Sequence, residues 1–286
     1  MVLFQSMTTV SWLTAAAFIL LMWFGSMKNP ITIAGIFIRQ LFTSRTYLFH
    51  ILALVAILVL NNVELKIENA MNLQWDFTPF IHQIEGNFVH HFQQWFRNDW
   101  VTTIVGFFYV VIFQALLLSS LSIYTAEKKN QMVYATVYAV MINYIIAIPF
   151  YLFFPVNEVW SYAPAQVQFL MLDIFPNFEQ QYRALSGLNN CFPSLHTSVS
   201  VTLAILAIRS GNKRWAIFST ISAVIIVFSI FYLGIHWLTD MIGGLVLAGT
   251  ASTLGYWLAH RNTLRSPSTL SVPGREGVPK QPLDQR

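Results

Sequence analysis

The sequence predicts an all-α polytopic membrane protein: a helical bundle of about six or seven transmembrane helices, with interfacial helices in two long outer loops. Hydrophobic residues make up 56% of the 286 residues and charged residues only 10%, whereas soluble domains carry about 25% charged residues. Most of the long apolar runs approach the ~20 residues that cross ~30 Å of hydrocarbon. This composition excludes an ordinary soluble domain.

The apolar runs give seven candidate spans, of which the second and fifth are short. They cover residues 8–25, 47–62, 101–122, 132–154, 196–210, 214–235 and 238–259. The first run has neither the basic n-region nor the small-residue cleavage site of a signal peptide, so we expect a retained helix. A single cysteine, Cys191, excludes an intramolecular disulfide and gives no information on redox compartment.

Basic residues gather in alternate loops. The loops after the odd-numbered spans hold Lys28, Arg39, Arg45, Lys128, Lys129, Arg209, Lys213, Arg214, Arg261 and Arg265. The other loops hold only Lys66, Arg97 and Arg183, alongside many acidic residues. The positive-inside rule makes the first set cytoplasmic. We therefore expect an integral protein of the plasma membrane, with the N-terminus outside and the C-terminus in the cytoplasm.

Three regions are not predicted to span the membrane. Residues 64–100 interleave aromatic and polar residues, a pattern typical of an amphipathic segment in the headgroup layer. Residues 155–195 form a second outer loop, too long and too aromatic to be a simple disordered connection. The tail at 262–286 is rich in Pro, Ser and charge, and we expect it to be disordered and cytoplasmic. These limits leave N-terminal helices at 1–63 and a helical core at 101–261.

Two histidines and an aspartate are predicted to meet at the outer surface. The fifth span runs inward from "FPSLHTS" and the sixth returns outward to "FSIFYLGIHWLTDMIGG", so His196 and His236 lie at the outer ends of one hairpin. Asp240 follows His236 at i+4, the spacing of neighbours on one helix face. A carboxylate there would accept the imidazole N–H and make the other nitrogen more basic. The structural alternatives are histidines bonded to the backbone and a helix-capping Asp240.

An anion site is predicted beside these residues. Pro193 suits the first turn of a helix, so the amides of Ser194 and Leu195 would be unpaired and point outward. Free amides at a positive helix end bind anions. The Ser194 hydroxyl would add a donor, although an ordinary N-terminal hydroxyl is the alternative. A phosphate bound there would lie between His196 and His236.

These motifs resemble those of the type-2 phosphatidic acid phosphatase (PAP2) superfamily. "FPSLHTS" is similar to its second motif, and Ser229, His236 and Asp240, spaced S-x6-H-x3-D, are similar to its third. "NCFPSLH" and "YLGIHWLTDMIGG" look most like the branch that includes inositol-phosphorylceramide synthases. The resemblance covers residues 189–244 well and the rest only as a pattern of membrane helices.

The resemblance implies a lipid phosphate substrate and no metal or other cofactor. His236 would be the nucleophile that forms a phosphohistidine, and Asp240 would orient it. His196 would protonate the leaving group, and Ser194 would bind the phosphate.

The chain departs from the family pattern in its basic residues. Ile230 stands where an Arg often follows the serine of the third motif, and Phe153–Pro164 holds no basic residue where the first motif has a Lys and an Arg-Pro pair. Arg183 is the basic residue nearest to the site in sequence, so we expect it to bind phosphate or to pair with Glu179 one turn earlier. A cradle with fewer cations favours a singly charged phosphodiester over a dianionic monoester.

Other residues near the motifs have structural interpretations. Nothing in the sequence activates Cys191 as a nucleophile, so we expect it to be structural. Gly243 and Gly244 are predicted to allow close helix packing. Tyr232 and Trp237 are interpreted as anchors at the membrane interface.

Together these features predict a membrane enzyme that hydrolyses a lipid phosphate or diphosphate at the outer interface through a phosphohistidine. Two alternatives remain open. One is transfer of a phospho-headgroup to a lipid alcohol, and the other is a non-catalytic lipid-binding or transport protein. We expect membrane lipids as partners and no nucleic acid; the sequence assigns no oligomeric state.

Overall fold

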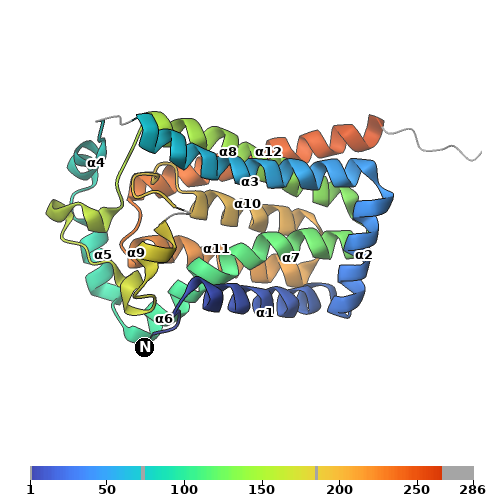
Figure 1. Cartoon of the computed structure of the whole chain (residues 1–286), viewed down its shortest axis with the longest axis horizontal. Helices are drawn as coiled ribbons and strands as arrows, with labels where there is room; N and C mark the ends of the chain where they lie inside the picture. The colour runs from blue at the N-terminus through green and yellow to red at the C-terminus, as the bar shows by residue number, and fades with distance from the viewer. Residues whose placement is uncertain (1, 72–74, 184–185, 266–286) are drawn as a thin grey trace, which may run out of the picture.

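Long helices run side by side along the longest axis of the molecule, and shorter helices cluster at one end (Figure 1). The computed structural model describes residues 2–71, 75–183 and 186–265. The helices are α1 (Met7–Ser26), α2 (Pro30–Thr43), α3 (Arg45–Met71), α4 (Thr78–Glu85), α5 (Phe88–Phe96), α6 (Asp99–Phe107), α7 (Phe113–Ala126), α8 (Asn130–Phe153), α9 (Phe178–Gln181), α10 (Leu195–Arg209), α11 (Lys213–Tyr232) and α12 (Leu238–Arg265). A π-helical turn, Phe108–Ile112, joins α6 to α7. The described part contains no strand beyond one isolated β-bridge.

Six helices of the described chain are long and apolar enough to cross a membrane. They lie at Met7–Ser26, Arg45–Glu68, Asp99–Ala126, Asn130–Phe153, Lys213–Tyr232 and Leu238–Asn262. The predicted fold class, a polytopic all-α bundle, is therefore confirmed, and the protein is an integral membrane protein. The fifth predicted span corresponds to α10, whose 15 residues make it a shorter apolar helix. α10 packs against α8, α11 and α12 within the bundle.

Three predicted boundaries differ from the structure. Residues 64–71 continue α3, so the segment outside the bundle begins later than the amphipathic pattern indicated. A loop was expected after the first span, but α2 lies there, with Asn29 capping its first turn and Pro30 at its first position. α12 continues to Arg265, beyond the predicted start of the tail. The rest of the predicted tail, residues 266–286, lies outside the described residues.

The loops that carry most of the basic residues meet at one end of the bundle, where α2 lies across it (Figure 1). Lys28 Nζ donates to the carbonyl of Ala126 at 2.8 Å, and Lys129 Nζ donates to the carbonyl of Ser210 at 2.8 Å. These contacts satisfy carbonyls at helix C-termini, where cations are favoured. They also lock the loops at this end to one another.

The opposite end holds the N-terminus together with α4, α5 and α9 (Figure 1). The amides of Leu3 and Phe4 both donate to the carbonyl of Ile174 at 2.9 Å, and the Phe4 ring contacts Phe175. The N-terminal segment is thereby held against the loop that precedes the "FPSLHTS" motif. The predicted alternation of the loops between two ends is present in the structure; which end faces the cytoplasm remains a prediction.

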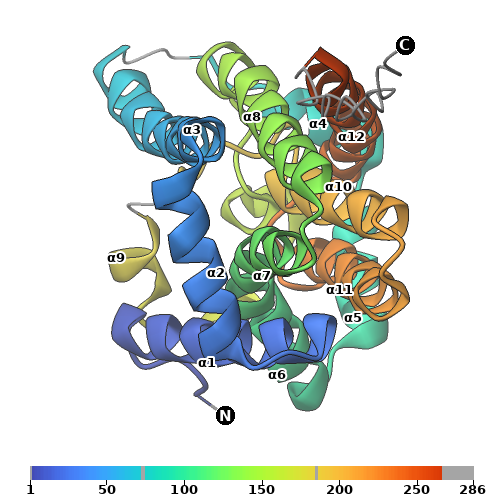
Figure 2. The same cartoon turned by 90° about the vertical axis from the view of Figure 1, so that its right-hand side faces the viewer.

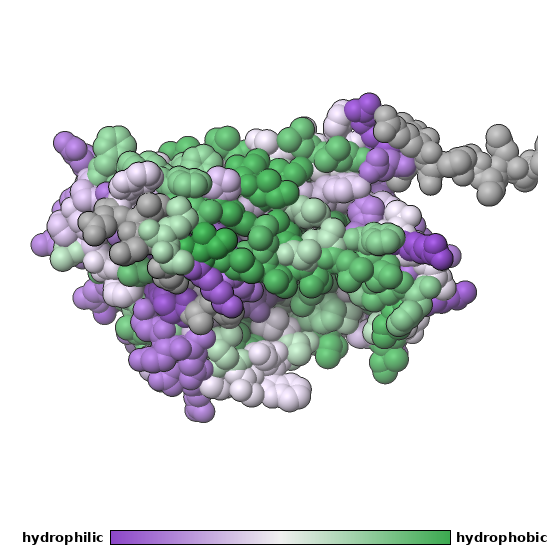
Figure 3. All heavy atoms as spheres, turned by 45° about the horizontal axis from the view of Figure 1, so that its top comes forward, coloured by the Kyte–Doolittle hydropathy of each residue, from purple (hydrophilic) through white to green (hydrophobic). Residues whose placement is uncertain are grey.

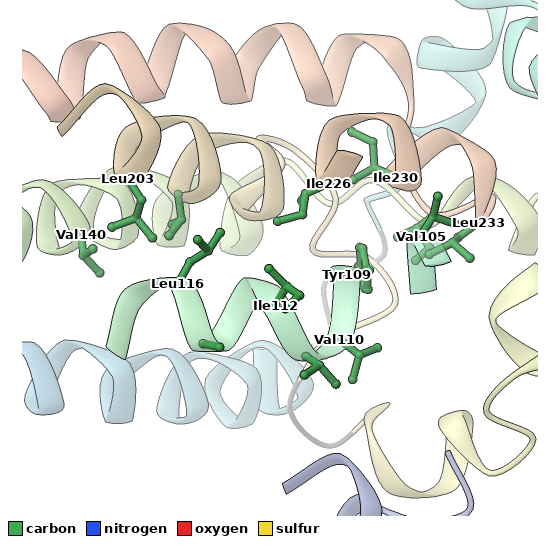
Figure 4. Close-up of a cluster of buried hydrophobic side chains, with 14 of the residues drawn as sticks. Val105, Tyr109, Val110, Ile112, Leu116, Val140, Leu203, Ile226, Ile230 and Leu233 are labelled. Atoms are coloured by element: carbon green, nitrogen blue, oxygen red, sulfur yellow. The ribbon is translucent and has the colours of Figure 1, made fainter. Parts of the chain in front are cut away.

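The bundle surrounds α7 and presents apolar side chains to its sides. α7 lies in the middle of the helices when the molecule is viewed along its length (Figure 2). Figure 4 shows Ile112 and Leu116 beside Leu203 of α10 and Ile226 of α11, and all four are buried. On the surface, apolar residues cover the middle of the face in Figure 3 and polar residues collect toward its two ends. This is the distribution expected for a bundle embedded in hydrocarbon.

Candidate active site

His196 is the second residue of α10, two positions after the capping residue Ser194. Its imidazole stacks on the Tyr109 ring, with 3.9 Å between ring centroids and an interplanar angle of 14°. The Phe113 ring packs near it at 4.3 Å. The buried Nε2 atom of His196 has no hydrogen-bond partner in the part of the chain that the structure describes. The two aromatic rings therefore fix the orientation of the imidazole and leave a nitrogen available.

His236 lies in the loop between α11 and α12, and Asp240 is the third residue of α12. The prediction that both residues share one helix face is therefore wrong. Asp240 Oδ2 instead reaches back to the start of its helix, accepting from the Trp237 amide at 2.9 Å and lying 3.2 Å from His236 Nδ1. An acidic residue at the third helical position commonly caps in this way. Capping and orientation of the histidine are thus performed by the same oxygen.

The two histidines meet across a small cavity, as the hairpin argument predicted. Their ring centroids lie 6.4 Å apart, and both residues line a cavity of about 130 Å3. Leu195 and Cys191 line it as well. So do the four tyrosines Tyr109, Tyr144, Tyr151 and Tyr182. No sequence pattern indicated these tyrosines as site residues, because most of them lie inside apolar runs.

The predicted anion site is present only in part: the Ser194 amide donates to the carbonyl of Asp240 at 3.1 Å, so the prediction that this amide is unpaired is wrong. Leu195, at the N-terminal end of α10, lines the cavity, and the first amides of a helix lack intrahelical partners. Ser194 does not line the cavity; its hydroxyl accepts the amide of residue 197 at 3.3 Å, the capping alternative. Its role as a phosphate ligand stays a prediction. A side chain on Gly244 would meet the Ser194 carbonyl at 2.8 Å, and one on Gly243 would meet the Phe192 ring, so the predicted close packing is confirmed.

Arg183 is engaged by two carboxylates. Its guanidinium donates to Glu158 at 2.8 and 3.0 Å and to Glu179 at 2.6 and 3.2 Å. Burial by itself would lower the pKa of Arg183. The hydrogen bonds and charges of the two carboxylates outweigh this effect and raise the pKa above its ordinary value, so the guanidinium stays charged. Arg183 is not among the residues that line the cavity, whereas Glu158 is. A contact between Arg183 and phosphate, still a prediction, would require at least one of these ion pairs to open.

Glu85, at the end of α4, is a site residue that the sequence did not indicate. Its carboxylate accepts the amides of Leu238 at 2.6 Å and Thr239 at 2.5 Å, and it also accepts the Thr239 hydroxyl. These are the first amides of α12, which otherwise lack partners. Burial raises the pKa of Glu85, and the three hydrogen bonds oppose that effect. The helix that carries Asp240 is therefore capped from a segment more than 150 residues away in the chain.

Cys191, His236 and Asp240 bring three potential metal-ligating atoms within 4.8 Å of one another. Two of these groups already bond to each other, and burial, followed by the charges of nearby carboxylates, raises the pKa of the Cys191 thiol well above its ordinary value. A thiol must lose its proton to bind a metal strongly. The contacts of Cys191 are with backbone carbonyls at 3.8 and 3.9 Å, as expected for a structural residue. Catalysis without a metal stays a prediction.

Tyr232 and Trp237 are buried, so the interpretation of both as interface anchors is wrong. Trp237 Nε1 donates to the carbonyl of Asn157 at 2.9 Å, which joins the loop that carries His236 to the loop between α8 and α10. The Tyr232 hydroxyl bonds with the backbone of Asn98 and with Thr102 at the start of α6. Both rings therefore hold the ends of helices together at the end of the bundle that carries the cavity.

Comparisons with known proteins identify the family of the chain. A lipid A 4'-phosphatase from Bacteroides thetaiotaomicron is 37% identical over 91 residues, which are 32% of this chain and 40% of that relative. No solved structure matches the chain. The family model described as PAP2 superfamily matches residues 79–254, which include both histidines, Asp240 and Glu85. The chain belongs to the PAP2 superfamily.

Proposed function

We propose that the protein is a membrane phosphatase that releases phosphate from a lipid phosphate or diphosphate through a phosphohistidine on His236. The observation that carries this proposal is the pair of histidines across one cavity, with a buried carboxylate behind His236. Reacting atoms approach to about 3–3.5 Å. A separation of 6.4 Å between the rings leaves room for a phosphoryl group between them.

In the first step, His236 Nε2 attacks phosphorus while the bond between phosphorus and the lipid oxygen breaks. Protonated His196 gives its Nε2 proton to that oxygen, so the lipid leaves as an alcohol, or as a lipid monophosphate when the substrate is a diphosphate. Phosphorylated His236 carries a positive charge, which the Asp240 carboxylate stabilises at Nδ1.

In the second step, His196 takes a proton from water and the resulting hydroxide attacks phosphorus. The bond to Nε2 breaks, inorganic phosphate leaves, and both histidines return to their starting states.

The side of the membrane and the route of the lipid are parts of the same proposal. The site lies at the end of the bundle that holds the long loops, the end predicted to be non-cytoplasmic. A lipid would enter laterally between helices, with its phosphate at the headgroup level and its tails in the hydrocarbon. We infer the plasma membrane as the location.

Phosphate release by the purified protein in detergent tests the proposal. The panel holds phosphatidate, an isoprenyl diphosphate, lysolipid phosphates and a phosphorylated glycolipid, the last because of the name of the partial relative. His236→Ala should abolish release, and His196→Ala should lower it by about 10²–10⁴-fold. The exposed His91→Ala is the matched control and should match the wild type.

Two further measurements sharpen the result. Mass spectrometry of the rapidly quenched enzyme should find phosphate on the peptide that contains His236. Excess chelator should leave the rate unchanged, and a rate restored only by an added metal would contradict catalysis by histidines alone. Phosphate release that persists in His236→Ala would overturn the proposed nucleophile.

Transfer of a phospho-headgroup to a lipid alcohol is the second candidate, favoured by one observation. Among the described residues that line the cavity there is no Lys or Arg, so a singly charged phosphodiester suits the cavity better than a dianion. The comparisons assign the chain to the superfamily and to no branch of it, so the synthase-like branch stays a prediction. A new phospholipid formed from a headgroup donor and a lipid alcohol would establish transfer. If neither phosphate release nor a new phospholipid is detected, a lipid-binding or transport protein is favoured.

A further inference from the structure

The cavity between the histidines contains an acid and lacks a free cation. Glu158 lines it, and in the part of the chain that the structure describes neither Lys nor Arg does. The guanidinium nearest to it, that of Arg183, is shared between Glu158 and Glu179, so this trio carries a net charge of about −1. A phosphate that enters the cavity therefore needs donors other than cations.

Tyrosine hydroxyls are the most numerous candidates for that role. Of the four that line the cavity, Tyr151 donates to the carbonyl of Pro193 at 3.0 Å, and Tyr182 shares a hydrogen bond with a glutamine side chain. The hydroxyls of Tyr109 and Tyr144 make no hydrogen bond within the described residues. Both residues line the cavity, so each hydroxyl is a candidate donor to a ligand bound there.

The position of Tyr109 is fixed relative to the catalytic groups. Its ring is 3% exposed and stacks on His196, and its hydroxyl lies within electrostatic range of Glu158 and Cys191. Tyr109 belongs to the π-helical turn between α6 and α7, a local distortion that occurs frequently at functional sites. Tyr144 reaches the same cavity from α8. Two helices thus bring free donors to the space between the histidines.

We propose that Tyr109 and Tyr144 bind the non-bridging oxygens of the substrate phosphate, and that this neutral cradle selects a phosphate with one negative charge. Phenol donors and the first amides of α10 stabilise one charge on an oxygen acceptor. A second charge would be desolvated beside Glu158 without a counter-ion, which is costly. The reaction at this site rests on the proposed function, whereas the binding preference does not.

Two sources supply a singly charged phosphate. One is a phosphodiester, and the other is a monoester that keeps one proton, a form populated below its second pKa of about 6. Titratable groups of the protein line the cavity, and Asp240 lies behind His236. Their titration affects both ligands alike only if both are measured on the same protein variant. The groups that line the cavity are Tyr109 from the π turn, Tyr144 and Tyr151 from α8, His196 from α10, and Glu158, Tyr182, Cys191 and His236 from the loops.

Dodecyl phosphate and its methyl ester separate the charge of the ligand from the titration of the protein. Binding of both is measured between pH 5 and pH 8 on full-length His236→Ala in detergent, a variant expected not to turn them over. Only dodecyl phosphate gains a second charge in this range, and about 1% of it remains singly charged at pH 8. Its affinity relative to the methyl ester should therefore fall by up to ~100-fold from pH 5 to pH 8. A ratio that stays constant or rises overturns the charge preference.

Tyrosine variants test the ligands themselves. Tyr109→Phe and Tyr144→Phe, each in the His236→Ala background, should weaken binding of the methyl ester by about tenfold, since each removes one hydrogen bond to a charged group. Both keep the ring, so the stack on His196 is preserved. Tyr138→Phe is the matched control. Tyr138 lies on α8, as Tyr144 does, but its hydroxyl bonds with His50 and Asn262 outside the cavity. Equal affinity in all three variants would overturn the assignment.

The failure of this inference is distinguishable from the failure of the proposed function. Binding that follows the expected pattern without phosphate release in the wild type would leave the tyrosine cradle standing and remove the phosphatase. Release of phosphate by the wild type with no loss of affinity in either tyrosine variant would do the reverse.

Discussion

Asp240 connects the two sequence motifs through separate atoms. Its carboxylate lies 3.2 Å from His236 Nδ1 and accepts the Trp237 amide, while its backbone carbonyl accepts the amide of Ser194 at 3.1 Å. The start of α10, which carries His196, is therefore bonded directly to the start of α12. Because Asp240 is fully buried, its charge has to be compensated by these donors. One residue thus links the proposed nucleophile to the start of the helix that carries the proposed acid.

Asp240→Asn should lower the rate of phosphate release by about 10²–10⁴-fold. The amide preserves the size of the side chain, but it can no longer balance the positive charge of phosphorylated His236 and can favour the wrong tautomer. The rate is measured on the best substrate of the panel. Asp99→Asn is the control, since Asp99 is exposed in the first turn of α6 and does not line the cavity. Equal rates in both variants would refute the orienting role.

Cys191 should react slowly with iodoacetamide at pH 8 in the folded protein. Burial raises the pKa of the thiol well above its ordinary value, so the reactive thiolate is scarce until the pH rises through that higher value. In the unfolded chain the thiol ionises near pH 8.5, so denaturant should accelerate labelling. Labelling kinetics with and without denaturant check this. Cys191→Ala should keep most of the phosphatase activity, and its loss would reopen a catalytic role for the thiol.

At the level of elements, α4 acts as a cap for α12. The amphipathic pattern of the outer segment predicted a helix lying in the headgroup layer, and α4 does carry exposed apolar residues such as Phe80 and Ile84. Its last residue, Glu85, nevertheless turns inward and binds the first amides of α12. The segment therefore serves the active site as well as the membrane surface.

Glu85→Ala should lower both the melting temperature and kcat, with a smaller change in KM, because Glu85 positions the loop of His236 without contacting the cavity. The loss of a cap lowers the free energy of unfolding by ~1 kcal/mol, and the loss is larger when the amides left without a partner are buried. Glu85→Gln keeps one acceptor oxygen and should recover part of kcat. Gln83→Ala, exposed on the same helix, is the control. A drop in melting temperature with kcat unchanged would limit Glu85 to a structural role.

At the level of the whole molecule, two different ends enclose an apolar middle (Figure 3). One end is closed by α2 and by lysine contacts to helix carbonyls, and the other carries the site, roofed by the two long loops. The uneven distribution of Lys and Arg predicts which end is cytoplasmic. Orientation is therefore the property of the molecule that labelling can test directly.

A membrane-impermeant maleimide should label Gln83→Cys but not Lys128→Cys on intact cells, both in a Cys191→Ala background. The two side chains are exposed, the first on α4 at the end of the site and the second in the loop between α7 and α8. Opening the cells should make both reactive, which controls for expression and folding. The opposite pattern would place the active site in the cytoplasm.

Much of the molecule was predictable because it depends on local or statistical properties of the chain. Apolar runs fix which segments cross the membrane, since each must satisfy its own backbone in lipid. Because successive runs cross the membrane in opposite directions, their order alone predicted that His196 and His236 lie at the same end of the bundle. The apolar runs did not indicate α2, because its apolar stretch is short. They also did not indicate the full length of α3, because its last turns are polar and extend beyond the apolar run.

The sequence by itself determined the class of fold, the end of the bundle where the chemistry lies, and the three catalytic candidates. Only the tertiary structure decided how they are held: the reach of Asp240 around a helix start, the cap from Glu85, the pairing of Arg183 with two acids, and the tyrosines around the cavity. The reason is physical. Hydrophobic period and charge bias act along the chain, whereas these contacts depend on how segments turn and pack in space, as in the Glu85 cap between residues 153 positions apart.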